Sequence, residues 1–354
     1  MTLYIILAIL IFALLIFVHE LGHFLSAKLF GVRVNEFSLC MGPAIWQKTI
    51  GETTYSIRSI PIGGFCALEG EDDDTDDPRS FQKAKTWKRI IILAAGSLMN
   101  FLTGFLLLLI LYAPVQSVIT PTIIDFQEGC VLEGPEALQT GDTFYRIDGE
   151  RVYQYSNLDL LLNRNTDGTF DLEILRDGKL LKLEDFAMQK QEFEIEGQTK
   201  QLYGFLFGYE TMNFPLYLKT AWFNAVDFVR MVRLSLQDLV SGLIKPNDIS
   251  GPVGIVNLIA DTGKSSETTA QAALNISYLA AFLAVNLAVM NLLPIPALDG
   301  GRIVFLMITK LLETVLKRKI NPKYEGYIHA ATMILLFAFL AFVTLHDIRS
   351  LIVR

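Results

Sequence analysis

Long apolar runs alternate along the chain with polar stretches rich in turn-forming residues. Four of these runs are long enough to cross a bilayer, which takes about 20 apolar residues. They lie in the segments 1–27, 90–115, 268–302 and 326–354. The first run lacks the basic start and small-residue cleavage site of a secretory signal, so we expect it to be retained. The pattern predicts a polytopic α-helical membrane protein with four transmembrane helices.

The polar segment 28–89 is not a simple loop. Around YSIRSIPIGGF the apolar residues alternate, and glycines and prolines punctuate them, which predicts strands and tight turns. An acidic run, EDDDTDD, follows at 71–77. A calcium-binding loop that starts at Asp72 would need glycine at its sixth position and glutamate at its twelfth, where Asp77 and Lys83 stand. We therefore expect a solvated acidic loop.

Segment 116–208 is a separate region of short strands. Asp177-Gly178 lies between two apolar strands and is typical of a hairpin turn. NLDLLLNR at 157–164 predicts a short amphipathic helix. Together they predict one small α+β domain. Segment 209–267 is expected to hold amphipathic helices over 216–244 and a GPVGI motif, and 303–325 to form a loop.

Composition supports a membrane protein with one sizeable polar part. Hydrophobic residues make up 52% of the chain and charged residues 19%, below the roughly 25% of soluble proteins, and the mean hydropathy is +0.40. The net charge of −7 argues against nucleic acid as a partner. The lipid bilayer is the partner that the composition predicts. The three cysteines form neither a disulfide framework nor a metal cluster.

The distribution of basic residues predicts the orientation. Lysine and arginine gather in 28–89 and 303–325, whereas the N-terminal run has none before Lys28. Basic loops stay on the cytoplasmic side of a membrane. We therefore expect both loops to be cytoplasmic in a multi-pass cell-membrane protein, with both termini and segment 116–267 outside.

Ionisable residues inside the first apolar run carry the candidate chemistry. The stretch LIFVHELGHFL contains H-E-x-x-H, with His19, Glu20 and His23. On a helix, residues four apart lie on one face about 5–6 Å apart, so both imidazoles can reach one ion. Two imidazoles and a carboxylate suit Zn²⁺ and leave a fourth position for water. Ionisable side chains are also costly in a membrane unless they have a function. The motif therefore predicts zinc, with Glu20 as the base that takes a proton from the water.

A third ligand must come from elsewhere in the chain. Asp299 is the first charge in the third run, in NLLPIPALDGGR, where Pro294 and Pro296 break the helix. The predicted topology places Asp299 at the same, cytoplasmic, end as HELGH. His329 lies on that side too and is the rival ligand, although an interfacial polar residue is the plainer interpretation. His346 lies at the opposite end and is excluded by depth.

The sequence resembles the bacterial site-2 proteases, which are intramembrane zinc metalloproteases. Five blocks carry the resemblance in the family's order: FVHELGHFLSAKLFGVRVNEFS, IPIGGFCALEGE, GSLMN, GPVGI and NLLPIPALDGG. One departure is Cys40, where the family usually has glycine. The resemblance implies that IPIGGFCALEGE belongs to a membrane-re-entrant β segment and that 116–208 is an extracytoplasmic PDZ-like domain.

The resemblance also implies roles for individual residues. His19, His23 and Asp299 would be the zinc ligands, Glu20 the base, and Asn291, with the nearby Pro294, would contact the substrate. The implied substrates are single-span membrane proteins such as anti-sigma factors, and also signal-peptide remnants. We expect the strand over 55–62, with Ile57 and Ile60, to lie on the side of the substrate opposite Asn291. Its exposed edge would unwind the substrate helix by pairing with it. The PDZ-like domain would exclude substrates with bulky outer domains.

Two other classes of protein stay open on the sequence. A catalytically idle scaffold could present its PDZ-like domain to partners, but such a protein would have little reason to keep Glu20. A metal-ion transporter would need ionisable residues in several spans, and 90–115 has none.

Overall fold

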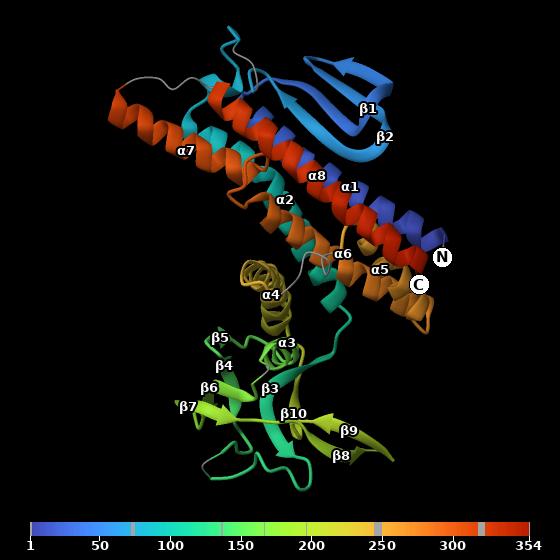
Figure 1. Cartoon of the computed structure of the whole chain (residues 1–354), viewed down its shortest axis with the longest axis vertical. Coiled ribbons are helices and arrows are strands. Elements are labelled where there is room, and N and C mark those ends of the chain that lie inside the picture. The colour runs from blue at the N-terminus through green and yellow to red at the C-terminus, as the bar shows by residue number, and fades with distance from the viewer. Residues whose placement is uncertain are drawn as a thin grey trace. The chain divides into compact units, whose positions relative to one another are not determined.

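The structure is a computed structural model that describes residues 2–71, 75–135, 137–165, 167–195, 197–243, 250–317 and 323–353. It divides into two compact units, which we consider separately (Figure 1). The helical unit comprises Met1–Leu111 and Phe228–Arg354, and the β-rich unit comprises Tyr112–Asp227. Helix α4, Phe214–Val240, runs from one into the other.

Among the residues that the structure describes, four helices are long and apolar enough to span a membrane, as the sequence predicts. They are α1 (Thr2–Phe30), α2 (Thr86–Tyr112), α6 (Thr269–Asn291) and α8 (Lys323–Val353). The protein is therefore a multi-pass membrane protein. A short helix, α5 (Pro252–Ser265), carries the GPVGI motif and packs against α1 and α6.

Local sequence explains where these helices end. After α1, Gly31 adopts a φ of +76° and the Val32 N–H donates to the Ala27 carbonyl at 2.9 Å, a glycine-dependent helix stop. Helix α6 starts at Thr268, whose hydroxyl accepts from the Gln271 N–H. It ends at Asn291, shortly before two prolines that lack the N–H a helix needs.

The expected loop over 303–325 is wrong for most of its length. Helix α7 covers Asp299–Leu316, and the segment from 318 to 322 lies outside the described residues. The physical reason is that RIVFLMITKLLETVL repeats apolar residues at three- and four-residue spacing with no breaker after Gly301. Segment 216–244 forms the single amphipathic helix α4 up to Val240.

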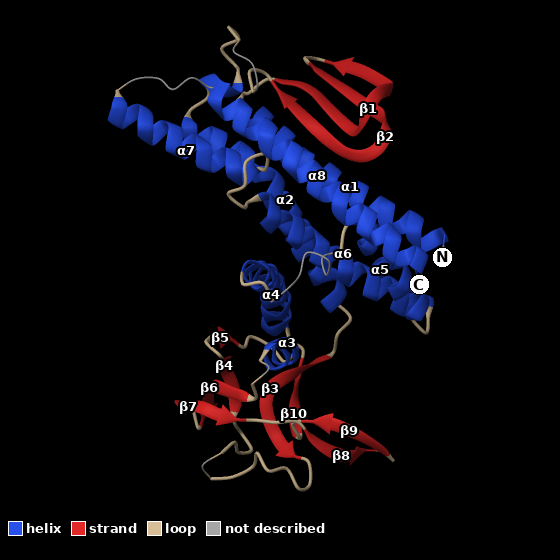
Figure 2. Ribbon diagram, viewed as in Figure 1, coloured by secondary structure: helices blue, strands red, loops and turns tan. Residues whose placement is uncertain are grey.

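The predicted strands of segment 28–89 form an antiparallel pair that is bent into a broader sheet (Figure 2). Strand β1 covers Val34–Ile50 and β2 covers Thr53–Leu68, and a 3-10 turn follows at Phe81–Lys83. Bulges let residues 36–39 pair with 54–57 on one side, while 34–39 pair with 64–68 on the other. Cys40 lies at the bend with a φ of +68°, a conformation that favours glycine.

This folding back overturns one expectation. Ile57 pairs with Leu39 on one side and Trp46 on the other, so the first half of 55–62 is an interior strand and not an edge. The linear sequence cannot show this, because the first half of β1 pairs with both halves of β2, and the second half of β1 pairs with the first half of β2 as well. Of the acidic run, residues 72–74 lie outside the described residues, and Asp77 forms an ion pair with Arg33.

The β-rich unit is an α+β region, as predicted. Its main sheet has the order β10-β3-β4-β6-β7, with β5 beside β4, and β8 and β9 form a separate hairpin. The strands are β3 (Ser117–Phe126), β4 (Thr143–Ile147), β5 (Glu150–Arg151), β6 (Thr169–Arg176), β7 (Lys179–Ala187), β8 (Gln191–Ile195), β9 (Gln198–Leu202) and β10 (Phe205–Thr211).

Two predicted local features of this unit are confirmed. Asp177 and Gly178 both have positive φ and join β6 to β7, as a tight hairpin requires. Helix α3 covers Ser156–Arg164 and buries its apolar face in the unit's core. That core centres on large side chains from the sheet: Ile123, Phe144, Ile147, Phe170, Leu172 and Ile174.

Candidate metal centre

Three side chains from two distant segments meet in the helical unit. His19 and His23 lie one turn apart on α1, and Asp299 is the first residue of α7. One potential ligand atom from each of the three lies within 4.8 Å of the others. Within the described residues, no other group of histidine, cysteine or acidic side chains forms such a cluster.

The distances fit a tetrahedral ion. Nε2 of His19 lies 3.1 Å from Asp299 Oδ2 and 3.2 Å from Nε2 of His23, and the third side of the triangle is 3.4 Å. Ligands at about 2.0–2.1 Å from a tetrahedral Zn²⁺ are themselves about 3.3–3.4 Å apart. Asp299 Oδ2 is buried and has no hydrogen-bond donor. Burial of such a carboxylate oxygen costs free energy unless a cation balances its negative charge. The three residues therefore fit zinc.

A hydrogen bond that His23 donates to α2 sets the tautomer of its ring. The His23 Nδ1 lies 2.8 Å from the Ile92 carbonyl oxygen, which can only accept, so Nδ1 carries the proton. The lone pair of the neutral ring is then on Nε2, the atom that faces His19 and Asp299. Metal-binding histidines characteristically use such a partner.

Two glycines let α2 approach the metal ligands. A Cβ on Gly96 would lie 2.3 Å from His23 Nε2 and 2.7 Å from His19 Cε1. On α1, a Cβ on Gly22 would lie 2.4 Å from the Ala95 carbonyl oxygen. Small residues at a helix crossing allow backbones to come close, and here they place α2 directly behind the imidazoles.

A cavity of about 360 Å³ opens beside the cluster. Glu20, one residue from the first ligand, lines it together with Asn291 at the end of α6. The Asn291 Nδ2 lies 3.5 Å from His19, at the limit of a hydrogen bond. The remaining lining residues are Ile16, His19, Gly63, Gly64, Asn100, Leu287, Ala297, Leu298 and Asp299.

Of the two rival third ligands, the structure places Asp299 with the histidines and His329 outside that cluster. The Nδ1 of His329 accepts the Ala297 N–H at 2.8 Å instead. Ala297 has a φ of +80° and lies two residues before Asp299. His329 thus supports the turn that presents the aspartate. Gly300 and Gly301 are needed in the same turn, since a Cβ on either would lie 2.1 Å from a carbonyl oxygen.

Some predicted substrate-contacting residues lie away from this cavity. Pro294 is in the turn after α6, and Ile57 and Ile60 are largely exposed; none of the three lines the cavity. Gly63 and Gly64 of β2 line it instead, and a Cβ on Gly64 would lie 3.4 Å from Glu20 Cγ. The second half of β2, not the first, therefore meets the cluster.

Sequence reasoning missed several residues of the site. The Ile92 carbonyl, Gly63-Gly64 and Asn100 carry no chemical signal of their own, and only the glycine of GSLMN hinted at a close approach by α2. Cys66 of β2 is not one of the three residues whose ligand atoms converge.

Comparisons with known proteins agree with this geometry. The sequence profile of peptidase family M50 matches residues 7–339. The chain is 34% identical over 354 residues to a Fusobacterium nucleatum protein and 31% identical over 353 residues to one from Clostridium perfringens, both provisionally named zinc metalloproteases. These alignments cover 97% and 98% of this chain and 98% of each relative. The regulator of sigma-W protease RasP of Bacillus subtilis is 26% identical, with 97% of both chains covered.

Proposed function

Because the chain belongs to peptidase family M50, the site-2 protease family, we propose that it cuts peptide bonds within the transmembrane segments of membrane-anchored regulators. It is a zinc metalloendopeptidase of regulated intramembrane proteolysis. The proposed substrates are single-span proteins such as anti-sigma factors, and also signal-peptide remnants. The name of the Bacillus subtilis relative, a regulator of sigma-W, supports the first class. The observation that carries the proposal is the convergence of His19, His23 and Asp299 beside Glu20.

Each of these residues has one role in the proposed mechanism. His19, His23 and Asp299 would hold the zinc through the three atoms that already face one another. When bound, the metal would supply a Lewis acid. Glu20 would take a proton from the attacking water and then give it to the leaving amine, so that one carboxyl group would serve as base and acid in turn.

The cavity also provides for the substrate backbone. A peptide bond in a helix has its carbonyl hydrogen-bonded, so the helix must unwind before it is cut. Within the part of the chain that the structure describes, residues 64–68 of β2 pair with β1 alone, which leaves their other edge open near Glu20. An extended substrate segment can add to this edge. Asn291 lines the same cavity and would donate to a substrate carbonyl.

The β1–β2 sheet has the surface expected of a segment within the bilayer. Its exposed side chains include Ile45 at 72%, Trp46 at 49% and Ile60 at 47% of their full surface. Large apolar side chains on a water-facing sheet are costly. Lipid contact removes that cost and supports a membrane-re-entrant segment, with Ile57 and Ile60 toward the lipid or an approaching substrate helix.

The β-rich unit is proposed to act as an extracytoplasmic PDZ-like domain, with the zinc site near the cytoplasmic face. The basic residues of 28–89 and 303–325 support this orientation. A folded unit between the second and third spans would exclude substrates with bulky outer domains. Cleavage would then follow a first cut elsewhere.

Replacement of Glu20 tests the proposal. The purified protein in lipid vesicles is given a single-span test protein, and Glu20→Gln is compared with the unchanged enzyme. We expect the variant to lose cleavage by at least about 100-fold, the usual contribution of a general base, while it keeps one zinc per chain. Leu14→Gln, on an exposed position of the same helix, is the control for a polar change. Full cleavage by Glu20→Gln would remove the assigned base. A chain that binds no metal and cuts nothing would favour the scaffold.

A further inference from the structure

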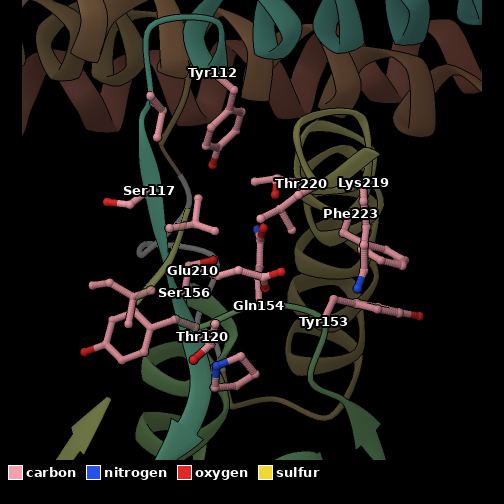
Figure 3. A pocket seen from close by; sticks show the side chains of 16 residues that line it. Tyr112, Ser117, Thr120, Tyr153, Gln154, Ser156, Glu210, Lys219, Thr220 and Phe223 are labelled. Atoms are coloured by element: carbon pink, nitrogen blue, oxygen red, sulfur yellow. The ribbon is translucent and has the colours of Figure 1, made fainter. Parts of the chain in front are cut away.

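The β-rich unit contains a second cavity of about 330 Å³ (Figure 3). One wall is the first half of β3, with Ser117 and Thr120, and the opposite wall is α4, with Thr220 and Phe223. Tyr112, the last residue of α2, also lines it, so the cavity begins where the chain leaves a membrane span. None of the residues of the metal centre belongs to it.

Strand β3 has one unpaired edge along this cavity. Its residues 117–119 pair with β10, but its only pairing with β4 is at Thr122 and Thr143. In an antiparallel strand, alternate residues direct N–H and C=O to opposite sides. The Gln116 carbonyl accepts the Met212 N–H at 2.8 Å, so Gln116 faces the β10 side. By this alternation the backbone groups of Ser117 and Ile119 face away from β10, on the side where no strand described in the structure pairs with them.

Pro121 lies at an irregularity of the β3–β10 pairing. The register shifts between the pairs Ile119–Tyr209 and Ile123–Phe207. Proline has no N–H and is confined within sheets to edges and bulges, where no ladder bond is lost. The regular pairing of 117–119 with β10 therefore ends before Pro121.

Gln154 supplies a further unused donor. Its Nε2 is buried and has no hydrogen-bond partner. The side chain lies between the wall that carries Ser117 and Thr120 and the wall that carries Thr220 and Phe223 (Figure 3). A buried amide without an acceptor costs free energy, which a carbonyl oxygen in the cavity would recover.

We propose that this cavity binds the extracytoplasmic flank of a substrate as an added strand on β3. Backbone groups of Ser117 and Ile119 pair with the flank, and Gln154 donates to one of its carbonyl oxygens. Main-chain pairing gives affinity with little demand on side chains, which suits a protease that takes several substrates. The inference rests on the proposed function and adds a second attachment point, outside the zinc site.

Proline substitutions can test the open edge of β3 independently of the edge that pairs with β10. Ile119→Pro removes the N–H on the open side, and Ile119→Ala keeps it and controls for the lost side chain. Val118→Pro removes an N–H on the β10 side instead. We expect Val118→Pro to lower the unfolding midpoint of the purified protein and Ile119→Pro to leave it close to that of Ile119→Ala.

Cleavage kinetics then test whether the outer flank of the substrate binds to this edge. The test protein has one apolar span and an unfolded outer flank, and a second version lacks the flank. We expect Ile119→Pro to raise KM about fivefold relative to Ile119→Ala, the effect of one net hydrogen bond, with kcat unchanged. Gln154→Ala should act in the same direction. With the flankless version, neither change should alter KM.

Photo-crosslinking gives a readout that is independent of activity. A photoreactive residue is moved one position at a time along the flank and trapped on Glu20→Gln enzyme. We expect crosslinks to 112–121 and 153–156 whose yield alternates with a period of two, as a strand requires. If the enzyme cuts the test protein, yet crosslinks avoid β3 and Ile119→Pro matches Ile119→Ala with both versions, the strand-addition site is refuted and the protease assignment stands. If nothing is cut by the unchanged enzyme, the proposed function itself fails.

Discussion

Gly96 offers a sharp test of the metal centre because it carries no chemistry of its own. Gly96→Ala adds one methyl group to α2, and that carbon would lie 2.3 Å from His23 Nε2 and 2.9 Å from His19 Nδ1. Alanine is a better helix former than glycine, so the substitution does not weaken α2 by itself. Any loss must come from the contact with the two imidazoles.

The size of the required shift follows from the contact distance. Ordinary contacts of a Cβ begin near 3.4 Å, so the His23 ring must retreat by 3.4 − 2.3 = 1.1 Å, or α2 must move by as much. Zinc sites tolerate deviations of only about 0.2 Å in ligand distance. The change also separates His23 Nδ1 from the Ile92 carbonyl. Loss of such a supporting partner alone weakens metal binding about 10–100-fold, and displacement of the ligand itself should exceed that range.

Zinc affinity is measured on the purified protein by competition with a chromophoric chelator, and cleavage is measured in parallel. We expect Gly96→Ala to lose zinc and activity together and to keep the helical content of the unchanged protein. Gly104→Ala is the matched control in the same helix, because its added carbon would meet Val285 and Ala281 of α6 and not a histidine. It should lower stability but keep zinc. A Gly96→Ala enzyme with zinc bound at full affinity would refute the close approach of α2 to the ligands.

Further predictions concern the supports of the site and of the fold. His329→Ala removes the acceptor for the Ala297 N–H and should lower kcat/KM about tenfold, as for other outer partners, whereas His329→Gln restores much of it. Asp347→Ala leaves the Gly254 N–H of α5 without its acceptor at 2.8 Å, and should lower the free energy of unfolding by about 1–3 kcal/mol in a denaturant titration.

Much of this protein could be predicted locally. The four spans follow from unbroken apolar length, which is a property of each segment alone. The histidine pair of α1 follows from helical spacing, and the hairpin at Asp177-Gly178 from two residues that tolerate positive φ. In each case the residues that decide the outcome are within a few positions of one another.

The rest depended on contacts between distant segments. The sequence kept His329 as a rival to Asp299 at the same predicted end of the helices. In the structure, His329 of α8 accepts the Ala297 N–H, and Asp299 faces the histidines at 3.1 Å from His19. Likewise, periodicity predicts the strands of 34–68 but not which half of β2 lies at the edge of the sheet. Bulges place the first half of β1 between the two halves of β2. Pairing and ligand choice are set by which backbone and side-chain atoms come within about 3 Å, and a linear pattern does not contain those distances.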